Sequence, residues 1–352
     1  MSGLPAEHFR APGIYIGLPE EDYFPDRSIG GSAIKDFLSS TEEWWWGSGF
    51  NTLDPRVDVG SSSTRRGNLV HCLMLEGLAT YEARYAVEFD NRAARALGAL
   101  DTATDLRLEL ERLGGVAPKS AKKSDLVKAV LALNPDARIL AHLQAEHAAS
   151  LPGKTLVPAT WDSHARVAHR IAQHDPLIRE IFSEGLPEVS VFWRNARGVP
   201  CRARIDWLRR DKTVDLKTYD DRSTGRHREG AWVSAIKARR YDLQEAHYRE
   251  ARAMMPKLEI YGGTHEQRAY VLECATFPDP AFTFVFAKTA GAPHVEEVWL
   301  EHTLVRAAQS DRDAALDRWA DYYAAFGLDK PWFTTSSGTE LNATDFPAYF
   351  GT

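Results

Sequence analysis

The chain has 352 residues, of which 44% are hydrophobic, and it carries ten tryptophans and a net charge of −6. This composition predicts a globular protein with a large core, in one big domain or two. No stretch approaches the ~20 apolar residues of a membrane span, and the N-terminus lacks the apolar core of a signal peptide. We therefore expect a cytoplasmic protein without membrane contact. The three cysteines are odd in number and scattered, which favours neither a disulfide framework nor a zinc site.

The first part of the chain, to about Thr64, is rich in glycine, proline and serine. Short helices are expected over Ser32–Leu38 and Thr41–Trp46. The second of these ends in three consecutive tryptophans, which we expect to form an aromatic anchor that covers the core. A wedge that stacks on a DNA end is the alternative interpretation.

A helix is predicted over Arg65–Glu76, and it is apolar nearly all round, which indicates burial. His71 lies in its middle, and a buried imidazole needs a hydrogen-bond or metal partner. Gly67, one turn earlier, removes a side chain beside it, so that another backbone or an ion can approach. Both a core histidine with a satisfied ring and a metal ligand fit this pattern.

Two amphipathic helices are predicted over Thr104–Leu113 and Ser124–Leu133, with Thr102 or Thr104 and Ser124 as N-caps. The pattern is similar to SAP-like helix-extended-helix modules, which bind DNA in other proteins. That likeness implies that Lys119, Lys122 and Lys123 face phosphate. A helical hairpin with a solvated basic loop is the equal alternative.

The second half of the chain alternates helices and strands. Helices are expected over Thr160–Ser183, Lys237–Met255 and Thr303–Phe326, and strands over Val189–Arg194, Pro200–Arg209, Thr213–Thr218, Gln267–Thr276, Ala281–Thr289 and His294–Leu300. This order predicts an α/β fold with a mixed central sheet flanked by helices. The predicted division is an N-terminal part over residues 1–100, a helical insertion over 101–135 and the rest of the core over 136–352.

The strands on either side of Arg209–Lys212 are expected to form a β-hairpin. If the turn is symmetric, the residue numbers of two paired positions add up to 421, which sets Asp206 opposite Asp215. Like charges on directly opposed strand residues repel. A divalent cation between them would turn that repulsion into binding, and Mg²⁺ prefers carboxylate oxygens. Lys217 points the same way as Asp215, because strand side chains alternate between faces. The alternative is an exposed hairpin with a surface salt bridge.

The helix that follows the hairpin carries Tyr241, Gln244 and Tyr248 on one face. In a structural interpretation the tyrosines pack on the sheet and their hydroxyls contact water. In a functional one, Gln244 and Tyr248 touch a nucleic-acid backbone or brace the lysine. Spacing alone does not separate these interpretations.

A net charge of −6 is unexpected for a protein that holds DNA, because phosphate contacts by lysine and arginine supply most of the affinity. Positive charge must then be localised. The stretch 222–240 carries six lysines and arginines, Arg239 and Arg240 among them, against one glutamate. Its position directly after the hairpin favours phosphate contact over a merely solvated face.

Five motifs follow one another along the chain: Gly67-x-x-x-His71, Glu188 before a strand, Asp206, Asp215-x-Lys217 and Gln244-x-x-x-Tyr248. This order resembles the RecB-type branch of the PD-(D/E)XK nuclease superfamily, and most of all the phage and prophage exodeoxyribonuclease VIII (RecE) family. The resemblance implies a restriction-endonuclease-like core. It also implies that His71, Asp206, Asp215 and the Leu216 carbonyl ligate metal, with Lys217 as the catalytic lysine. Glu188 matches an acid that binds a second metal in some members.

The resemblance further implies a Mg²⁺-dependent exodeoxyribonuclease, with Mn²⁺ as a substitute ion, that digests double-stranded DNA from its ends in the 5′ to 3′ direction. A bacterial phage or prophage origin, a single-strand annealing protein as partner and a ring-like homo-oligomer are expected with it. A ring would let an acidic exterior coexist with a basic channel. A DNA-binding protein that cuts nothing and an endonuclease on the same scaffold are the alternatives.

Overall fold

The computed structural model describes residues 8–51, 53–54, 61–220, 228–289, 291–328 and 330–333. The chain separates into two compact units. The first combines Met1–Arg65 with Ile171–Thr352, and the second is Arg66–Arg170, which contains the predicted insertion and more of the chain on both sides of it. Among the residues described, no helix is both long enough and apolar enough to cross a membrane.

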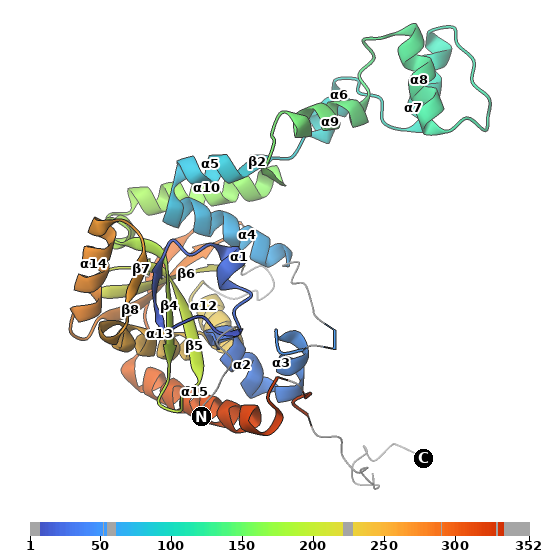
Figure 1. The fold of residues 1–352 in the computed structure, drawn as a ribbon. Coiled ribbons are helices and arrows are strands. Elements are labelled where there is room, and N and C mark those ends of the chain that lie inside the picture. The colour runs from blue at the N-terminus through green and yellow to red at the C-terminus, as the bar shows by residue number, and fades with distance from the viewer. Residues whose placement is uncertain are drawn as a thin grey trace, which may run out of the picture. The chain divides into compact units, whose positions relative to one another are not determined.

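The first unit is built on a seven-stranded mixed sheet with the order β7-β1-β4-β5-β6-β8-β9. The strands are β1 (Gly13–Ile16), β4 (Leu186–Arg194), β5 (Pro200–Leu208), β6 (Lys212–Tyr219), β7 (Ile260–Gly262), β8 (Ala281–Lys288) and β9 (Val295–Val298). Most neighbours are antiparallel, whereas β6 pairs with β8, and β1 with β7, in parallel. The predicted fold class, a mixed central sheet flanked by helices, is confirmed (Figure 1).

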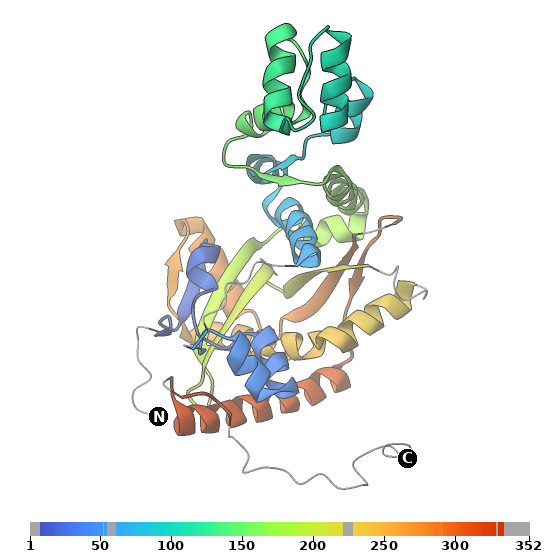
Figure 2. The same ribbon diagram turned by 90° about the vertical axis from the view of Figure 1, so that its right-hand side faces the viewer.

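Helices cover this sheet and bury its apolar face. They are α1 (Glu20–Tyr23), α2 (Gly31–Ser39), α3 (Thr41–Gly47), α11 (Pro176–Ile181), α12 (Arg228–Arg239), α13 (Tyr241–Met254), the 3₁₀ turn η3 (Met255–Lys257), α14 (His265–Thr276) and α15 (His302–Phe326). Figure 2 shows α13 and α15 running side by side beneath the strands. Inward side chains of β4 and β5, such as Val191 and Ala203, share one core with α13 and α15. Trp44 and Trp45 are buried in the same core, which confirms the aromatic anchor.

The second unit is mainly helical. Its elements are α4 (Ser62–His71), the π-helical turn η2 (Cys72–Glu76), α5 (Leu78–Arg84), β2 (Tyr85–Val87), α6 (Asn91–Ala96), α7 (Ala103–Arg112), α8 (Lys123–Leu133), α9 (Leu140–Ala149), β3 (Thr155–Val157) and α10 (Ala159–His174). The predicted pair of insertion helices is confirmed as α7 and α8, which close on a small core of leucine and valine. Thr102 caps α7 in a capping box, as predicted, whereas Lys122 and not Ser124 precedes α8.

The predicted strand over Gln267–Thr276 is wrong, because this segment is the helix α14. The Thr264 side chain accepts a hydrogen bond from the backbone of Gln267, and the Gln267 side chain accepts one from the Thr264 backbone. This capping box satisfies two backbone donors that a helix start otherwise leaves open. The cap at Thr264 therefore favours a helix over the predicted strand.

Two predicted helices are each divided by a local backbone feature. The segment expected as one helix from Lys237 breaks at Arg240, which has a left-handed backbone (φ 50°) and separates α12 from α13. The segment expected over Thr160–Ser183 breaks at Asp175, whose side chain caps α11 while Pro176 occupies its first turn. Proline has no N–H to donate and is therefore well placed at a helix start.

The capping box of α14 yields a stability prediction. Thr264→Ala removes the side-chain oxygen that accepts from Gln267 and is expected to lower the free energy of unfolding by about 1 kcal/mol. Urea unfolding followed by circular dichroism measures the change. The control is Thr276→Ala at the exposed end of the same helix, which should stay within about 0.5 kcal/mol of wild type. Equal losses in the two variants would contradict the role assigned to the cap.

Candidate active site

The hairpin that joins β5 to β6 has the predicted register. Trp207 pairs with Val214 and Leu208 with Thr213, so both pairs sum to 421. The Arg209 backbone N–H donates to the Lys212 carbonyl at 2.9 Å and closes the turn. The turn is therefore a fixed support for the strands that carry the acids.

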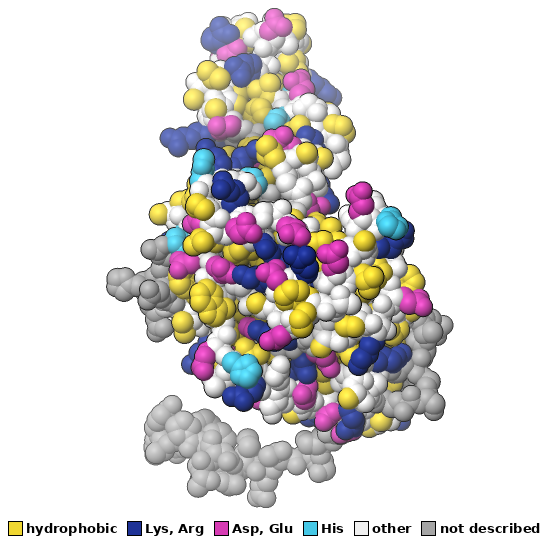
Figure 3. All heavy atoms as spheres, turned by 90° about the vertical axis from the view of Figure 1, so that its left-hand side faces the viewer, with side chains coloured by type: hydrophobic (Ala, Val, Ile, Leu, Met, Phe, Trp, Pro, Cys, Tyr) yellow, Lys and Arg dark blue, Asp and Glu magenta, His cyan; other side chains and the backbone are white. Residues whose placement is uncertain are grey.

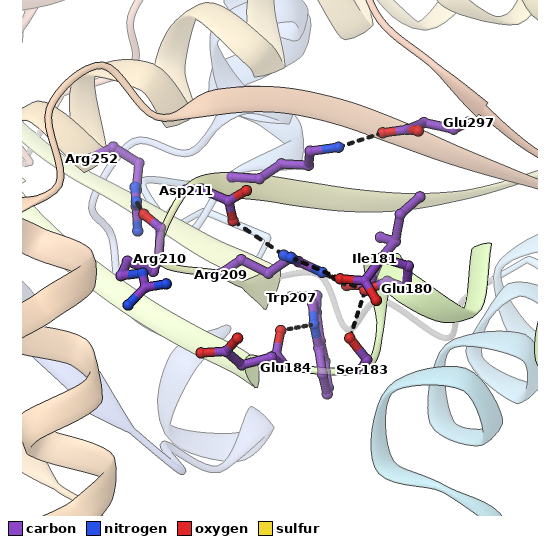
Figure 4. A network of polar contacts seen from close by, with 11 residues as sticks. Glu180, Ile181, Ser183, Glu184, Trp207, Arg209, Arg210, Asp211, Arg252 and Glu297 are labelled. Carbon is purple, nitrogen blue, oxygen red and sulfur yellow. Dashed lines mark hydrogen bonds and ion pairs between the residues drawn. The ribbon is translucent and has the colours of Figure 1, made fainter. Parts of the chain in front are cut away.

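Hydrogen bonds between the turn and other elements hold it in place, as Figure 4 shows. The Arg209 guanidinium donates to the carbonyls of Glu180 and Ile181 and lies 3.2 Å from an Asp211 carboxylate oxygen. From α13, Arg252 donates to the Arg210 carbonyl at 2.9 Å. The turn is thus anchored to α11 and to α13.

The ladder between β5 and β6 opens at Asp206. The paired positions end at Trp207 and Val214, and the Asp206 carboxylate then accepts the backbone N–H of Leu216 at 2.7 Å. A side-chain oxygen thereby takes the role that a strand carbonyl plays elsewhere in the ladder. This bond fixes one oxygen of Asp206 between the two strands, close to the backbone that leads from Asp215 to Lys217.

Asp215 is fully buried and is held from two directions. Gln244 on α13 donates to its Oδ1 at 2.7 Å, and the Lys217 ammonium lies 2.5 Å from its Oδ2. The ammonium also sits 4.9 Å from the centre of the Tyr241 ring, where a cation is favoured. Asp215 and Lys217 therefore share one face of β6, as their spacing predicts.

The Gln244-x-x-x-Tyr248 motif on α13 connects this helix to β5 and β6. Gln244 binds the acid and not the lysine, and the Tyr248 hydroxyl donates to the Arg204 carbonyl on β5 at 2.8 Å. Tyr248 is buried, so its hydroxyl is not exposed to water, as it would be if the tyrosines packed on the sheet with solvated hydroxyls. The contact of either side chain with DNA stays a prediction.

Burial and mutual repulsion set the protonation of the acids. Burial first, and the charge of Asp215 second, raise the pKa of Asp206 to about 7. Burial acts to lower the pKa of Lys217, but the charges of Asp215 and Asp206 outweigh it, so the net pKa is raised. The lysine is therefore an ammonium at neutral pH, whereas Asp206 is partly protonated there, and a cation could displace that proton.

A third acid, Glu188, lies beside Asp206 on the neighbouring strand. The β4–β5 register pairs Pro187 with Trp207 and Val189 with Ile205, which sets Glu188 across from Asp206. Its carboxylate oxygen lies within 4.8 Å of an Asp206 oxygen. Its backbone is left-handed (φ 55°), a conformation that costs energy for any residue with a side chain.

Arg204 completes the site and is a residue whose role the sequence did not reveal. Its Nε lies 2.5 Å from a Glu188 carboxylate oxygen. The sequence offered one signal, the stretch Arg204-Ile-Asp206, which resembles the Arg-x-Asp motif of RecB-type nucleases and whose spacing of two puts both side chains on the same face of β5. Without the register of β4 that spacing did not identify Glu188 as the partner.

Other predicted site residues belong to the second unit or take part in other interactions. His71 is the last residue of α4 in the second unit and is partly exposed, so its part in the site stays a prediction. Lys122 precedes α8, and Lys123 forms an ion pair with Asp101 at 3.4 Å. The metal-binding role of the Leu216 carbonyl likewise stays a prediction.

The basic stretch after the hairpin is only partly described, because residues 221–227 lie outside the described ranges. Arg239 is exposed, whereas Arg240 pairs with Asp242 at 3.0 Å and Asp311 at 2.7 Å. Figure 3 shows one face of the molecule, on which acidic and basic side chains are intermingled. Phosphate contact by Arg239 and Arg240 stays a prediction.

The donor set fits a hard divalent cation. Three carboxylates, Glu188, Asp206 and Asp215, come from three adjacent strands, and oxygen is the ligand type that Mg²⁺ prefers. Burial first, and the charge of Asp215 second, raise the pKa of Asp206, so the two acids repel one another at this point. A cation would relieve that repulsion.

Part of the chain matches a known protein family. Residues 136–265 match a family model described as a "PDDEXK-like domain of unknown function (DUF3799)". The matched region contains all three acids, the lysine and the Gln244 helix, and it supports the PD-(D/E)XK superfamily. No curated protein matches the sequence. A crystal structure described as a "Putative exonuclease" from Eubacterium rectale is similar, with a TM-score of 0.47 and 12% identity over 86% of this chain and 85% of that one.

The raised pKa of Asp206 predicts how stability depends on pH without divalent cations. The folded state keeps a proton at Asp206 up to about pH 7, whereas the unfolded state releases it near pH 4. Stability is therefore lost as pH rises between these values. Asp206→Asn keeps the acceptor for Leu216 without the charge, so its melting temperature in chelator should exceed wild type by roughly 2–5 °C at pH 8. The excess should vanish near pH 4.

Differential scanning calorimetry across this range measures the effect. Burial also raises the pKa of Glu245 to about 7, but this residue is present in both proteins and cancels in the difference. Lys217 stays charged throughout the window and adds no slope. An excess that is equal at pH 5 and pH 8 would show that the Asp206 charge does not destabilise the fold.

Proposed function

We propose that the protein is a Mg²⁺-dependent exodeoxyribonuclease that hydrolyses linear double-stranded DNA from its ends. The observation that carries the proposal is the buried Asp215, held by Gln244 and Lys217 beside a second acid, Asp206. The family match supports a nuclease of the PD-(D/E)XK type. The preference for ends, the 5′ to 3′ direction and a role in recombination come from the resemblance to exodeoxyribonuclease VIII.

In this proposal Asp206, Asp215 and the Leu216 carbonyl hold the cation, with His71 as a further ligand. A bound Mg²⁺ supplies Lewis-acid stabilisation of the scissile phosphate and lowers the pKa of a bound water. Lys217, kept protonated by its neighbours, stabilises negative charge that builds on phosphate oxygens. Gln244 fixes the rotation of the Asp215 carboxylate, so the second oxygen stays directed at Lys217.

The proposed partners follow from the same function. DNA ends are the substrate, Arg239 and Arg240 with Lys122 and Lys123 contact phosphate, and a homo-oligomer encircles the duplex. A single-strand annealing protein receives the strand that digestion exposes. Mn²⁺ replaces Mg²⁺, since both are hard ions that accept oxygen ligands.

An end-labelled linear duplex and a closed circular duplex, each with Mg²⁺ or with chelator, test the proposal directly. Mg²⁺-dependent loss of the linear form alone, with early release of a 5′ label, is the expected result. Nicking of the circle would identify an endonuclease instead. Retention of both forms without degradation would identify a DNA-binding protein that does not cut.

Substitution of the central pair is expected to abolish cleavage. Asp215→Asn and Lys217→Gln should each lower the rate at least ~100-fold, because each removes a charge that acts on the reacting phosphate or its cation. The control is Lys212→Gln on the same strand, whose side chain points to the other face and pairs with Glu297 at 2.7 Å. Near wild-type rates for the Asp215 and Lys217 variants would remove the proposed site.

The ligand role of His71 is testable separately. His71→Ala should weaken Mg²⁺ dependence roughly tenfold without abolishing cleavage at saturating Mg²⁺, because the carboxylates remain. The measurement is the rate as a function of Mg²⁺ concentration. An unchanged titration would return His71 to the interpretation as a core histidine.

A further inference from the structure

Two acids in this site require positive charge, and they lie on different strands. Glu188 and Asp206 sit across from one another on β4 and β5, with carboxylate oxygens within 4.8 Å. Like charges at this distance repel, and partial burial makes the repulsion stronger than in water. In a site with two cations, the second cation would neutralise Glu188.

The protein already supplies a cation at this point. The Arg204 Nε lies 2.5 Å from a Glu188 carboxylate oxygen, and the side chains of Arg204 and Glu188 are only 15% and 26% exposed. A charge-assisted bond of this kind is among the stronger hydrogen bonds in proteins. The left-handed backbone of Glu188 aims its carboxylate in spite of the conformational cost, which indicates a specific placement.

The guanidinium is also held from its other side. Its carbon lies 5.3 Å from the centre of the Tyr23 ring, and Tyr23 is buried. Arg202 lies over the same ring at 4.7 Å, but it donates to the carbonyls of Tyr23 and Phe24 and to no acid of the site. Arg204 is thus the arginine directed at the acids, and Arg202 is its structural neighbour.

We infer that Arg204 takes the place of a second cation, so that the site binds a single divalent ion between Asp206 and Asp215 while Glu188 pairs with the arginine. The inference rests on the proposed function. Arg204 acts here as a positioning residue, because it fixes Glu188 and limits where a cation binds. We expect removal of Arg204 to open a second cation site. Removal of an arginine with a purely structural role would not do so.

Isothermal titration of the full chain with Mn²⁺ counts the ions. Wild type should bind one ion per chain, and Arg204→Gln should bind a second, weaker ion because Glu188 loses the positive charge of its arginine partner. The double variant Glu188→Gln/Arg204→Gln should return to one ion. The control, Arg202→Gln, should bind one ion like wild type, although it also loses a contact with Tyr23.

The outcomes separate the inference from the function on which it rests. Two ions bound by wild type, or one ion bound by Arg204→Gln, would overturn the inference alone. No ion bound by any variant would overturn the proposed function and the inference together. Circular dichroism of each variant confirms that it is folded before its ions are counted.

A second variant keeps the test open if Arg204→Gln does not fold. Glu188→Gln in the wild-type background should bind one ion with unchanged affinity, because Glu188 pairs with the arginine. Loss of metal affinity by roughly tenfold or more would make Glu188 a ligand and overturn the inference.

Discussion

The site depends on one constraint: a carboxylate that is fully removed from water must have its charge compensated by the protein. Asp215 meets this condition with an ammonium on one oxygen and an amide on the other. Removing either partner would leave a buried charge with incomplete compensation, which is costly. The pKa of the neighbouring Asp206 rises to about 7, chiefly because the carboxyl is buried and secondly because of the charge of Asp215. In the proposed function, a cation would offset the repulsion between these two acids.

The helix α13 turns this local balance into a rigid arrangement. Side chains along it contact the hairpin at successive points: Gln244 binds Asp215, His247 and Tyr248 bind backbone carbonyls of β5, and Arg252 binds the turn. Three of these residues are spaced by four and therefore lie along one stripe of the helix. A site carried by strands and fixed by one helix can hold its geometry more accurately than a site on loops.

Arginine in this protein serves the interior as much as the surface. Arg204, Arg209, Arg252 and Arg312 are each engaged with carboxylates or carbonyls of the same chain. Counting basic residues along the sequence therefore overestimates the charge that is available to DNA. The question of how a chain of net charge −6 holds DNA turns on which of the basic residues remain exposed, and Arg239 is one that does.

The sequence by itself determined the strands that carry the acids, their register and the sharing of one face by Asp215 and Lys217, because pairing across a short turn and alternation along a strand are local rules. It also indicated the anchor of Trp44 and Trp45 and the helical hairpin of the insertion, since apolar periodicity extends over whole elements. It misjudged α14, whose start is fixed by the capping box at Thr264.

Only the tertiary structure decided which groups compensate the acids. Gln244 is 29 residues from Asp215 along the chain, and Glu188 is 16 residues from Arg204. Such partners are chosen by how strands pair and how a helix packs across them, which spacing in the sequence does not encode. The opening of the ladder at Asp206, the left-handed backbone of Glu188 and the pKa of Asp206 follow from the same packing, because they depend on burial and on neighbours distant in the chain.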